Sequence, residues 1–218
     1  MSRPVIVVVG AGPGVSGSVA RRFAGEGYDV GLLGAEQAVL DDLVPGLEAL
    51  GAAVGHTVAD VTDEQAARDA VRRFGEHTGR IDVLHFNPSA YREQDPLSLS
   101  VPELLEDVAL GVGALLTVVQ AARPYMSAGG RISVTGSMAA DEPWEGAASL
   151  GVQKAGVRNL VHSLDKTLAD DGIRAVSVTV RGALAREGAF TPDRVADALW
   201  AAVARDESGW TSEVPYSG

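Results

Sequence analysis

Residues Val5 to Gly17 read VIVVVGAGPGVSG, which predicts a strand that leads through a glycine-rich turn into a helix. The first five residues are apolar and β-branched, as expected for a parallel strand that is buried on both faces. Glycine at Gly10, Gly12 and Gly14 permits positive φ angles and lets the backbone come close to a ligand. The helix expected at Val15 to Glu26 presents N-terminal amides, which favour an anion. The stretch therefore predicts a dinucleotide pyrophosphate site, and the alternative is a tight turn that binds nothing.

Length and composition indicate one domain that spans residues 1–218. The chain is long enough to bury a large core, and it has no cysteine, which excludes disulfides and thiolate metal sites. Its formal net charge of −11 argues against nucleic acid and anionic membranes as partners. The first apolar run is too short for a secretory signal, and no later segment is expected to approach a membrane span. We therefore expect a cytoplasmic protein.

Strand-like and helix-like stretches alternate along the whole chain. This pattern predicts an α/β fold: a single doubly wound (Rossmann) domain, with a mostly parallel seven-stranded sheet and helices on both faces. Thr62 and Thr191 stand where helix caps are expected. The expected strands are 5–9, 29–33, 53–59, 82–86, 131–135, 174–179 and a short one near 210–214. The expected helices are 15–26, 36–50, 63–77, 102–126, 146–170 and 192–205.

Five further motifs follow the first turn, in order: Ala59-Asp60-Val61, Phe86-Asn87-Pro88-Ser89, Ile132 to Ser137 (ISVTGS), Leu150-Gly-Val-Gln-Lys154 and Arg181-Gly182. Read as Gly10-x-x-x-Gly14-x-Ser16, the turn and these motifs resemble the short-chain dehydrogenase/reductase family over nearly the whole chain. The resemblance implies an oxidoreductase that binds NAD(H) or NADP(H). It implies cofactor contacts from residues in several segments: Gly10, Gly12, Gly14, Ser16, Asp60, Val61, Asn87, Lys154 and Gly182.

The resemblance also implies catalytic positions, and here the chain departs from the family. Ser137 and Lys154 match the family's serine and lysine, although a turn cap and a solvated helix lysine are the alternatives. Leu150 stands where the family has its tyrosine acid/base, and a leucine carries no proton to transfer. Ala109 stands where the family commonly has an asparagine that holds a relay water. We therefore expect weak or altered carbonyl and alcohol redox chemistry.

Other groups are candidates for supplying the missing proton. Tyr91 is the best substitute, and an ordinary loop tyrosine is the alternative. His85 and His162 are expected to be packing residues rather than catalytic ones. No spacing of ligands indicates a metal site. Three acids fall in loops that face the same edge of the sheet: Asp141, Glu142 and Glu145.

The residues that set cofactor choice are few. In the family, an acid at the end of the second strand favours NAD, and a basic residue just after it or inside the glycine loop favours NADP. Here Gly34 and Ala35 stand at the end of the second strand, and Pro13 stands inside the glycine loop. Glu36, the nearest acid, comes two residues after the position where the family has its acid. The absence of a basic residue favours NAD(H).

The remaining expectations concern substrate, assembly and function class. Only residues 183–191 separate Gly182 from the last helix, where the family commonly has a longer lid, so the substrate cannot be identified. The helices at 102–126 and 146–170 are apolar on more than one face, which predicts a homodimer or homotetramer. Three classes stay open: an NAD(P)-dependent oxidoreductase, a cofactor-binding non-redox enzyme of the isomerase, cyclase or lyase type, and a non-catalytic regulatory or scaffold subunit.

Overall fold

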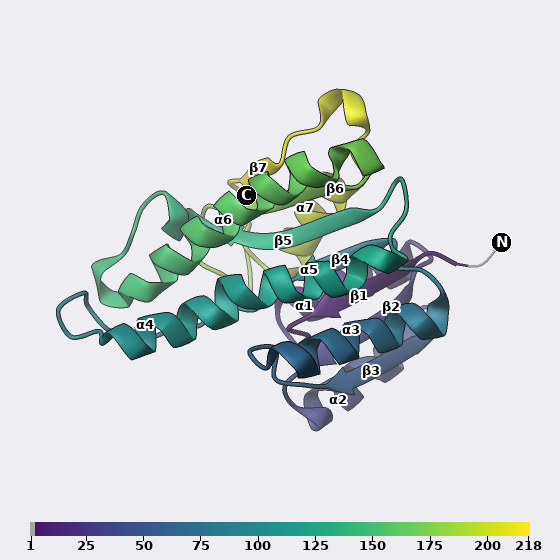
Figure 1. Cartoon of the computed structure of the whole chain (residues 1–218), viewed down its shortest axis with the longest axis horizontal. Coiled ribbons are helices and arrows are strands. Elements are labelled where there is room, and N and C mark those ends of the chain that lie inside the picture. The colour runs from purple at the N-terminus through teal and green to yellow at the C-terminus, as the bar shows by residue number, and fades with distance from the viewer. Residues whose placement is uncertain (1–2) are drawn as a thin grey trace.

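The computed structural model describes residues 3–218, which form one sheet of seven parallel strands (Figure 1). The strand order is β3-β2-β1-β4-β5-β6-β7, so the chain builds outward on one side of β1 and then on the other. The predicted doubly wound parallel sheet is confirmed. Its crevice is expected at the carboxyl ends of β1 and β4, where the strand order reverses. The strands are β1 (Val5–Val9), β2 (Asp29–Gly34), β3 (Val54–Val58), β4 (Val83–Phe86), β5 (Arg131–Ser137), β6 (Arg174–Val180) and β7 (Glu213–Tyr216).

Helices cover both faces of the sheet and enclose two apolar cores. One core lies under α3, α5 and α6, and the other lies under α1, α2 and α7. Thr191 caps α7 as expected, but the cap of α3 is Asp63, whose carboxylate accepts from the Ala66 amide, rather than Thr62. The helices are α1 (Val15–Gly25), α2 (Gln37–Glu48), α3 (Glu64–Thr78), α4 (Val101–Val108), α5 (Ala114–Ala122), α6 (Ala148–Leu168) and α7 (Pro192–Val203).

The helix predicted at 102–126 is not regular. A π-helical turn at Ala109–Gly113 separates α4 from α5. Within that turn Gly111 packs against α6 so closely that a Cβ atom would lie 2.5 Å from Oε1 of Gln153. The glycines at 111 and 113 also have low helix propensity. Packing against α6 and weak propensity together explain the break.

The last strand begins three residues later than predicted. The indole of Trp210 donates to the Asp165 carboxylate at 3.0 Å, and three guanidinium groups pack on its ring. This contact holds Trp210 outside the ladder, so β7 pairs with β6 only from Glu213 onward.

The helical stretch Val101–Tyr125 is long and apolar enough to cross a membrane by length and composition alone, because an 18-residue window within it has a mean hydropathy of 1.6. The expectation that no segment approaches a membrane span is therefore wrong on that criterion. The core helix of a soluble protein meets the same criterion, and α5 contributes Leu115, Val118 and Ala122 to the core beside α3.

Candidate active site

Two glycines, Gly10 in the turn after β1 and Gly17 in the first turn of α1, have no room for a side chain. Gly10 has a φ of +76°, and a Cβ atom there would lie 2.8 Å from the ring of Pro88. A Cβ atom at Gly17 would lie 2.5 Å from the carbonyl oxygen of Gly12. The turn and the start of α1 are therefore packed backbone to backbone, which fixes the direction of the α1 amides.

Ser16 is the residue of this turn whose side chain could fill the space needed by a phosphate. Its hydroxyl instead faces the turn, where it accepts from the Gly12 amide at 3.0 Å, and the residue is buried. A Cβ atom added at Gly14 would meet nothing within 4 Å. The surface over Gly14 is thus free of side chains, and the residues present fit a dinucleotide pyrophosphate at the α1 N-terminus.

A cavity of about 390 Å³ opens at the carboxyl ends of β1, β4, β5 and β6. It brings together residues that were predicted from separate segments of the chain: Gly14, Asn87, Tyr91, Ser137, Leu150, Lys154 and Gly182. Ser89, Val180 and Leu184 also line it and were not predicted. The cavity lies at the crevice expected for an open parallel sheet.

Lys154 projects from α6 into this cavity and is buried rather than solvated. Its Nζ donates to the carbonyl oxygen of Thr135 on β5 at 2.9 Å. Burial lowers the pKa of Lys154 to about 8, because the apolar surroundings disfavour the ammonium form. Leu150 lies one helical turn earlier on α6 and lines the same cavity.

Ser137 ends β5 and lines the cavity. Its Oγ also accepts from the Ala139 amide at 3.2 Å and caps the 3₁₀ turn Met138–Ala140. Ser137 can therefore both cap this turn and bind a substrate oxygen, because a hydroxyl that accepts from a backbone amide still has its proton to donate.

Asp60 and Val61 lie outside this cavity. Asp60 is exposed after β3, and bonds from the Thr62 hydroxyl at 2.7 Å and amide at 2.8 Å lower the pKa of its carboxyl. Val61 is buried in the core with α3 and α5.

Gly34, the last residue of β2, has no room for a side chain. A Cβ atom at Gly34 would lie 2.9 Å from the Ala11 carbonyl oxygen and the same distance from the Leu40 side chain. Ala35 and Glu36, the N-cap residue of α2, are exposed.

Tyr91 is the titratable residue besides Lys154 that lines the cavity. It is 58% exposed and stacks on Trp144, with ring centroids 6.3 Å apart. Asp141 pairs with Arg158 and Arg181, and these guanidinium groups hold the pKa of its carboxyl below the usual range. Asp141 is therefore a poor proton donor. The other two acids predicted for this region, Glu142 and Glu145, are exposed and do not line the cavity.

Neither candidate histidine lines the cavity. His85 is fully buried on β4, with Nδ1 3.3 Å from the Ser133 hydroxyl, and burial lowers its pKa to about 3. Nδ1 of His162 lies 2.6 Å from the Ser212 hydroxyl, and His162 does not line the cavity. Among residues 3–218, no group of three or more metal-ligating side chains is close enough to hold an ion.

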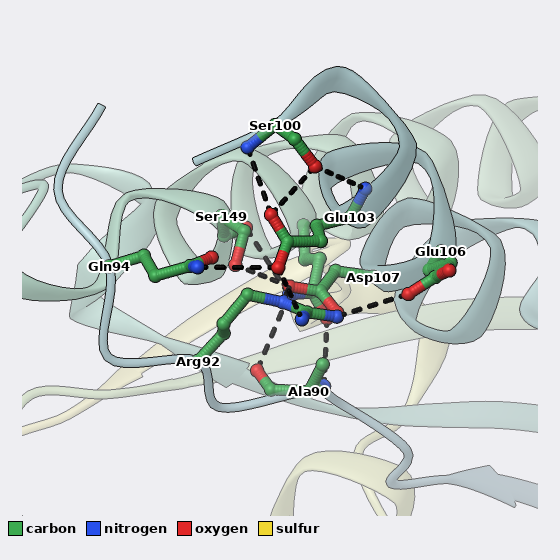
Figure 2. Close-up of polar contacts among 9 residues, drawn as sticks. Ala90, Arg92, Gln94, Ser100, Glu103, Glu106, Asp107 and Ser149 are labelled. Atoms are coloured by element: carbon green, nitrogen blue, oxygen red, sulfur yellow. Dashed lines mark hydrogen bonds and ion pairs between the residues drawn. The ribbon is translucent and has the colours of Figure 1, made fainter. Parts of the chain in front are cut away.

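A polar network that the sequence did not reveal holds the loop after β4 (Figure 2). Arg92 forms ion pairs with Glu103, Glu106 and the buried Asp107, all on α4. Asp107 also accepts from the Ser149 hydroxyl of α6 at 2.6 Å.

Next to this network, the buried side chain of Gln153 bonds to both backbone groups of Ala90, at 2.9 Å and 3.3 Å. The loop that carries Tyr91 is thereby fixed to both α4 and α6. The partners lie up to 63 residues apart in the chain, so the only local signal is the clustering of acids on α4.

The short segment 183–191 packs close to the sheet. The Phe190 ring fills the space beside Gly182, where a Cβ atom would lie 2.4 Å from it. The Tyr216 hydroxyl donates to the Ala189 carbonyl oxygen at 2.6 Å. Leu184 is the part of this segment that lines the cavity, which leaves the opening only partly covered.

Comparison with known proteins agrees with this architecture. Residues 4–185 match the family model described as short chain dehydrogenase. The oxidoreductase UcpA of Escherichia coli is 31% identical over 185 residues, a region that covers 79% of this chain and 66% of that protein. An uncharacterized oxidoreductase of Staphylococcus epidermidis is 25% identical, over 80% of this chain and 76% of its own.

Two solved structures superpose over nearly the whole chain. A short chain dehydrogenase from Burkholderia cenocepacia in complex with NADP gives a TM-score of 0.91 at 25% identity, over 99% of this chain and 96% of its own. A dehydrogenase/reductase from Sinorhizobium meliloti gives 0.90 at 22% identity, over 99% and 94%. With a family model matched over most of its length, this chain belongs to the short-chain dehydrogenase family.

Proposed function

We propose that the protein is an NAD(P)(H)-dependent oxidoreductase of the short-chain type whose active site is altered, so that carbonyl and alcohol redox chemistry is weak. The observation that carries this proposal is the cavity in which Leu150, Ser137 and Lys154 meet. Lys154 and Ser137 can orient a cofactor and a substrate oxygen, but Leu150, one helical turn before Lys154, has no proton that it could transfer. The named oxidoreductases among the relatives do not favour a non-redox enzyme or a non-catalytic subunit.

Different residues of this chain bind different parts of the dinucleotide. The amides after Gly12 hold the pyrophosphate, Asp60 and Val61 flank the adenine, and Lys154 with Asn87 binds the nicotinamide ribose. When bound, the nicotinamide supplies or accepts a hydride. Ser137 donates a hydrogen bond to the substrate oxygen, and Tyr91 or water provides the proton.

Cofactor binding is tested by calorimetric titration with NAD⁺, NADH, NADP⁺ and NADPH. We expect Gly14→Asp to weaken dinucleotide binding at least about tenfold, because it places a carboxylate against the phosphates, and juxtaposed like charges cost several kcal/mol. Gly25→Asp makes the same change at the far end of α1, also in open space, and should leave binding unchanged. Both variants are checked by thermal unfolding. No binding of any dinucleotide to the folded wild type would refute the proposed function.

We further propose that NADH binds at least as tightly as NADPH, because Gly34, Ala35 and Pro13 place no basic side chain at the adenosine ribose. Ala35 is exposed at the end of β2, so a longer side chain there can reach the ribose. Ala35→Arg is expected to shift the ratio of the two dissociation constants about tenfold towards NADPH through charge-assisted bonds to the 2′-phosphate. Ala35→Asp should shift it towards NADH. Equal ratios in both variants would contradict the proposed ribose position.

The protein is also proposed to be a cytoplasmic homodimer or homotetramer that pairs through α4, α5 and α6. Four large apolar side chains on these helices are exposed in the single chain: Val101, Leu105, Leu116 and Val152. Exposed apolar surface of this kind favours a partner. Light scattering at micromolar concentration is expected to give at least twice the monomer mass, and Leu105→Glu to lower it. A monomeric wild type would contradict the assembly.

A further inference from the structure

Lys154 lies in an environment that ordinary surface lysines do not have. The other residues that line its cavity include Val15, Leu150, Val180 and Leu184, and none carries a formal charge at neutral pH. Within residues 3–218 no carboxylate lies within ion-pair distance of Nζ, whose recorded partner is the Thr135 carbonyl oxygen. No opposite charge in the cavity therefore compensates for removing the ammonium from water.

The consequence is a large fraction of free amine. With a pKa of about 8, roughly a tenth of Lys154 is unprotonated at pH 7, whereas an ordinary lysine with a pKa of about 10.4 is unprotonated at well below 0.1%. A desolvated lysine amine in an apolar pocket is a nucleophile towards carbonyl carbon. The cavity of about 390 Å³ gives such a molecule room beside the amine.

We propose that, when no dinucleotide is bound, Lys154 captures neutral aldehydes and ketones as an imine. The nitrogen lone pair of Lys154 attacks the carbonyl carbon and forms a C–N bond, while the C=O π pair moves to oxygen. The oxygen gains a proton as the nitrogen loses one, which gives a carbinolamine. The nitrogen lone pair then forms the C=N bond as the C–O bond breaks, and the hydroxyl group takes the remaining N–H proton and leaves as water. The step needs neither oxidant nor reductant.

Ser137 and the cavity walls set the class of carbonyl compound. The Ser137 hydroxyl lines the cavity and donates a hydrogen bond to the carbonyl oxygen, which polarises it before attack. Leu150, Val180 and Leu184 favour an apolar chain, because they offer no polar partner.

The chain itself provides the test, because it contains only two lysines, Lys154 and Lys166. The full-length protein is incubated with hexanal and sodium cyanoborohydride at pH 7, and adducts are mapped by peptide mass spectrometry. Mapping separates both lysines from the α-amino group. Exposed Lys166, on the same helix, is the internal reference. We expect Lys154 to be labelled about 10²-fold faster than Lys166, because burial leaves a larger fraction of Lys154 as free amine.

Variants at residues 154 and 150 test whether the free amine of Lys154 is responsible for the labelling. Lys154→Arg should lose the adduct and keep the labelling of Lys166. Leu150→Tyr should slow labelling of Lys154 about tenfold, because an acidic phenol beside the amine keeps it protonated, whereas Leu150→Phe, without the hydroxyl, should not. Labelling of Lys154 no faster than Lys166 in folded protein would overturn the proposal. The readout is mass, so the result is independent of whether the proposed oxidoreductase activity exists.

Discussion

Leu150→Tyr is expected to raise reduction of at least one ketone or aldehyde, with a gain of up to the factor of about 10²–10⁴ that a positioned acid/base provides. Residue 150 lines the cavity one helical turn before Lys154, and Ser137 lines it from β5. A phenol there gains a neighbouring ammonium that favours its ionised form. Ala109 in the π turn and the short segment after β6 limit the gain, because neither supplies a relay water or a lid.

Steady-state oxidation of NADH or NADPH over a panel of carbonyl substrates measures this effect. Leu150→Phe is the matched control, because it adds the ring without the hydroxyl and should stay at the wild-type rate. An equal gain in both variants would show that filling the cavity, not the proton, is responsible. If the wild type already turns over at ordinary dehydrogenase rates, another group carries the proton, and Tyr91→Phe should then abolish turnover.

The alternation of strands and helices, and with it the doubly wound parallel sheet, was predictable because local patterns determine it. The buried strands are short apolar runs, helical stretches with start signals at α3 and α7 separate them, and the glycine turn at Gly10 to Gly17 leads into the first crossover. The π turn at Gly111 and the late start of β7 were not predictable. The π turn forms where Gly111 packs against Gln153, and β7 starts late because Trp210 bonds to Asp165. Each partner lies more than forty residues away in the chain.

The same distinction holds for the candidate site. Ser137, Leu150, Lys154 and Gly182 meet at one cavity, because parallel strands end at one edge of the sheet and motif spacing indicates which residues stand there. The network of Arg92, Asp107 and Ser149 has no such spacing. It exists only because α4 packs against α6 (Figure 1), a contact that no short motif encodes.

The free energy of unfolding is expected to fall steeply between pH 6.5 and pH 3 because of His85. The imidazole is fully buried, and its pKa of about 3 lies far below the value near 6.5 of an unfolded chain. Between these values the unfolded chain binds a proton that the folded protein does not. The contribution is therefore fully present above pH 6.5 and is lost by about 1.4 kcal/mol for each pH unit below it.

Chemical denaturation at pH 7 and pH 5 isolates this effect, because carboxylates with lowered pKa values titrate mainly below pH 4. His85→Leu, similar in size and without a titrating group, should reduce the loss of stability between these pH values by about 2 kcal/mol. The Ser133 hydroxyl is the hydrogen-bond partner of His85, its Nε2 has no partner among residues 3–218, and no carboxylate pairs with the ring, so no opposite charge stabilises the protonated form. An identical slope in His85→Leu and wild type would mean that the folded protein takes up the proton at this site, which requires water to enter beside β4.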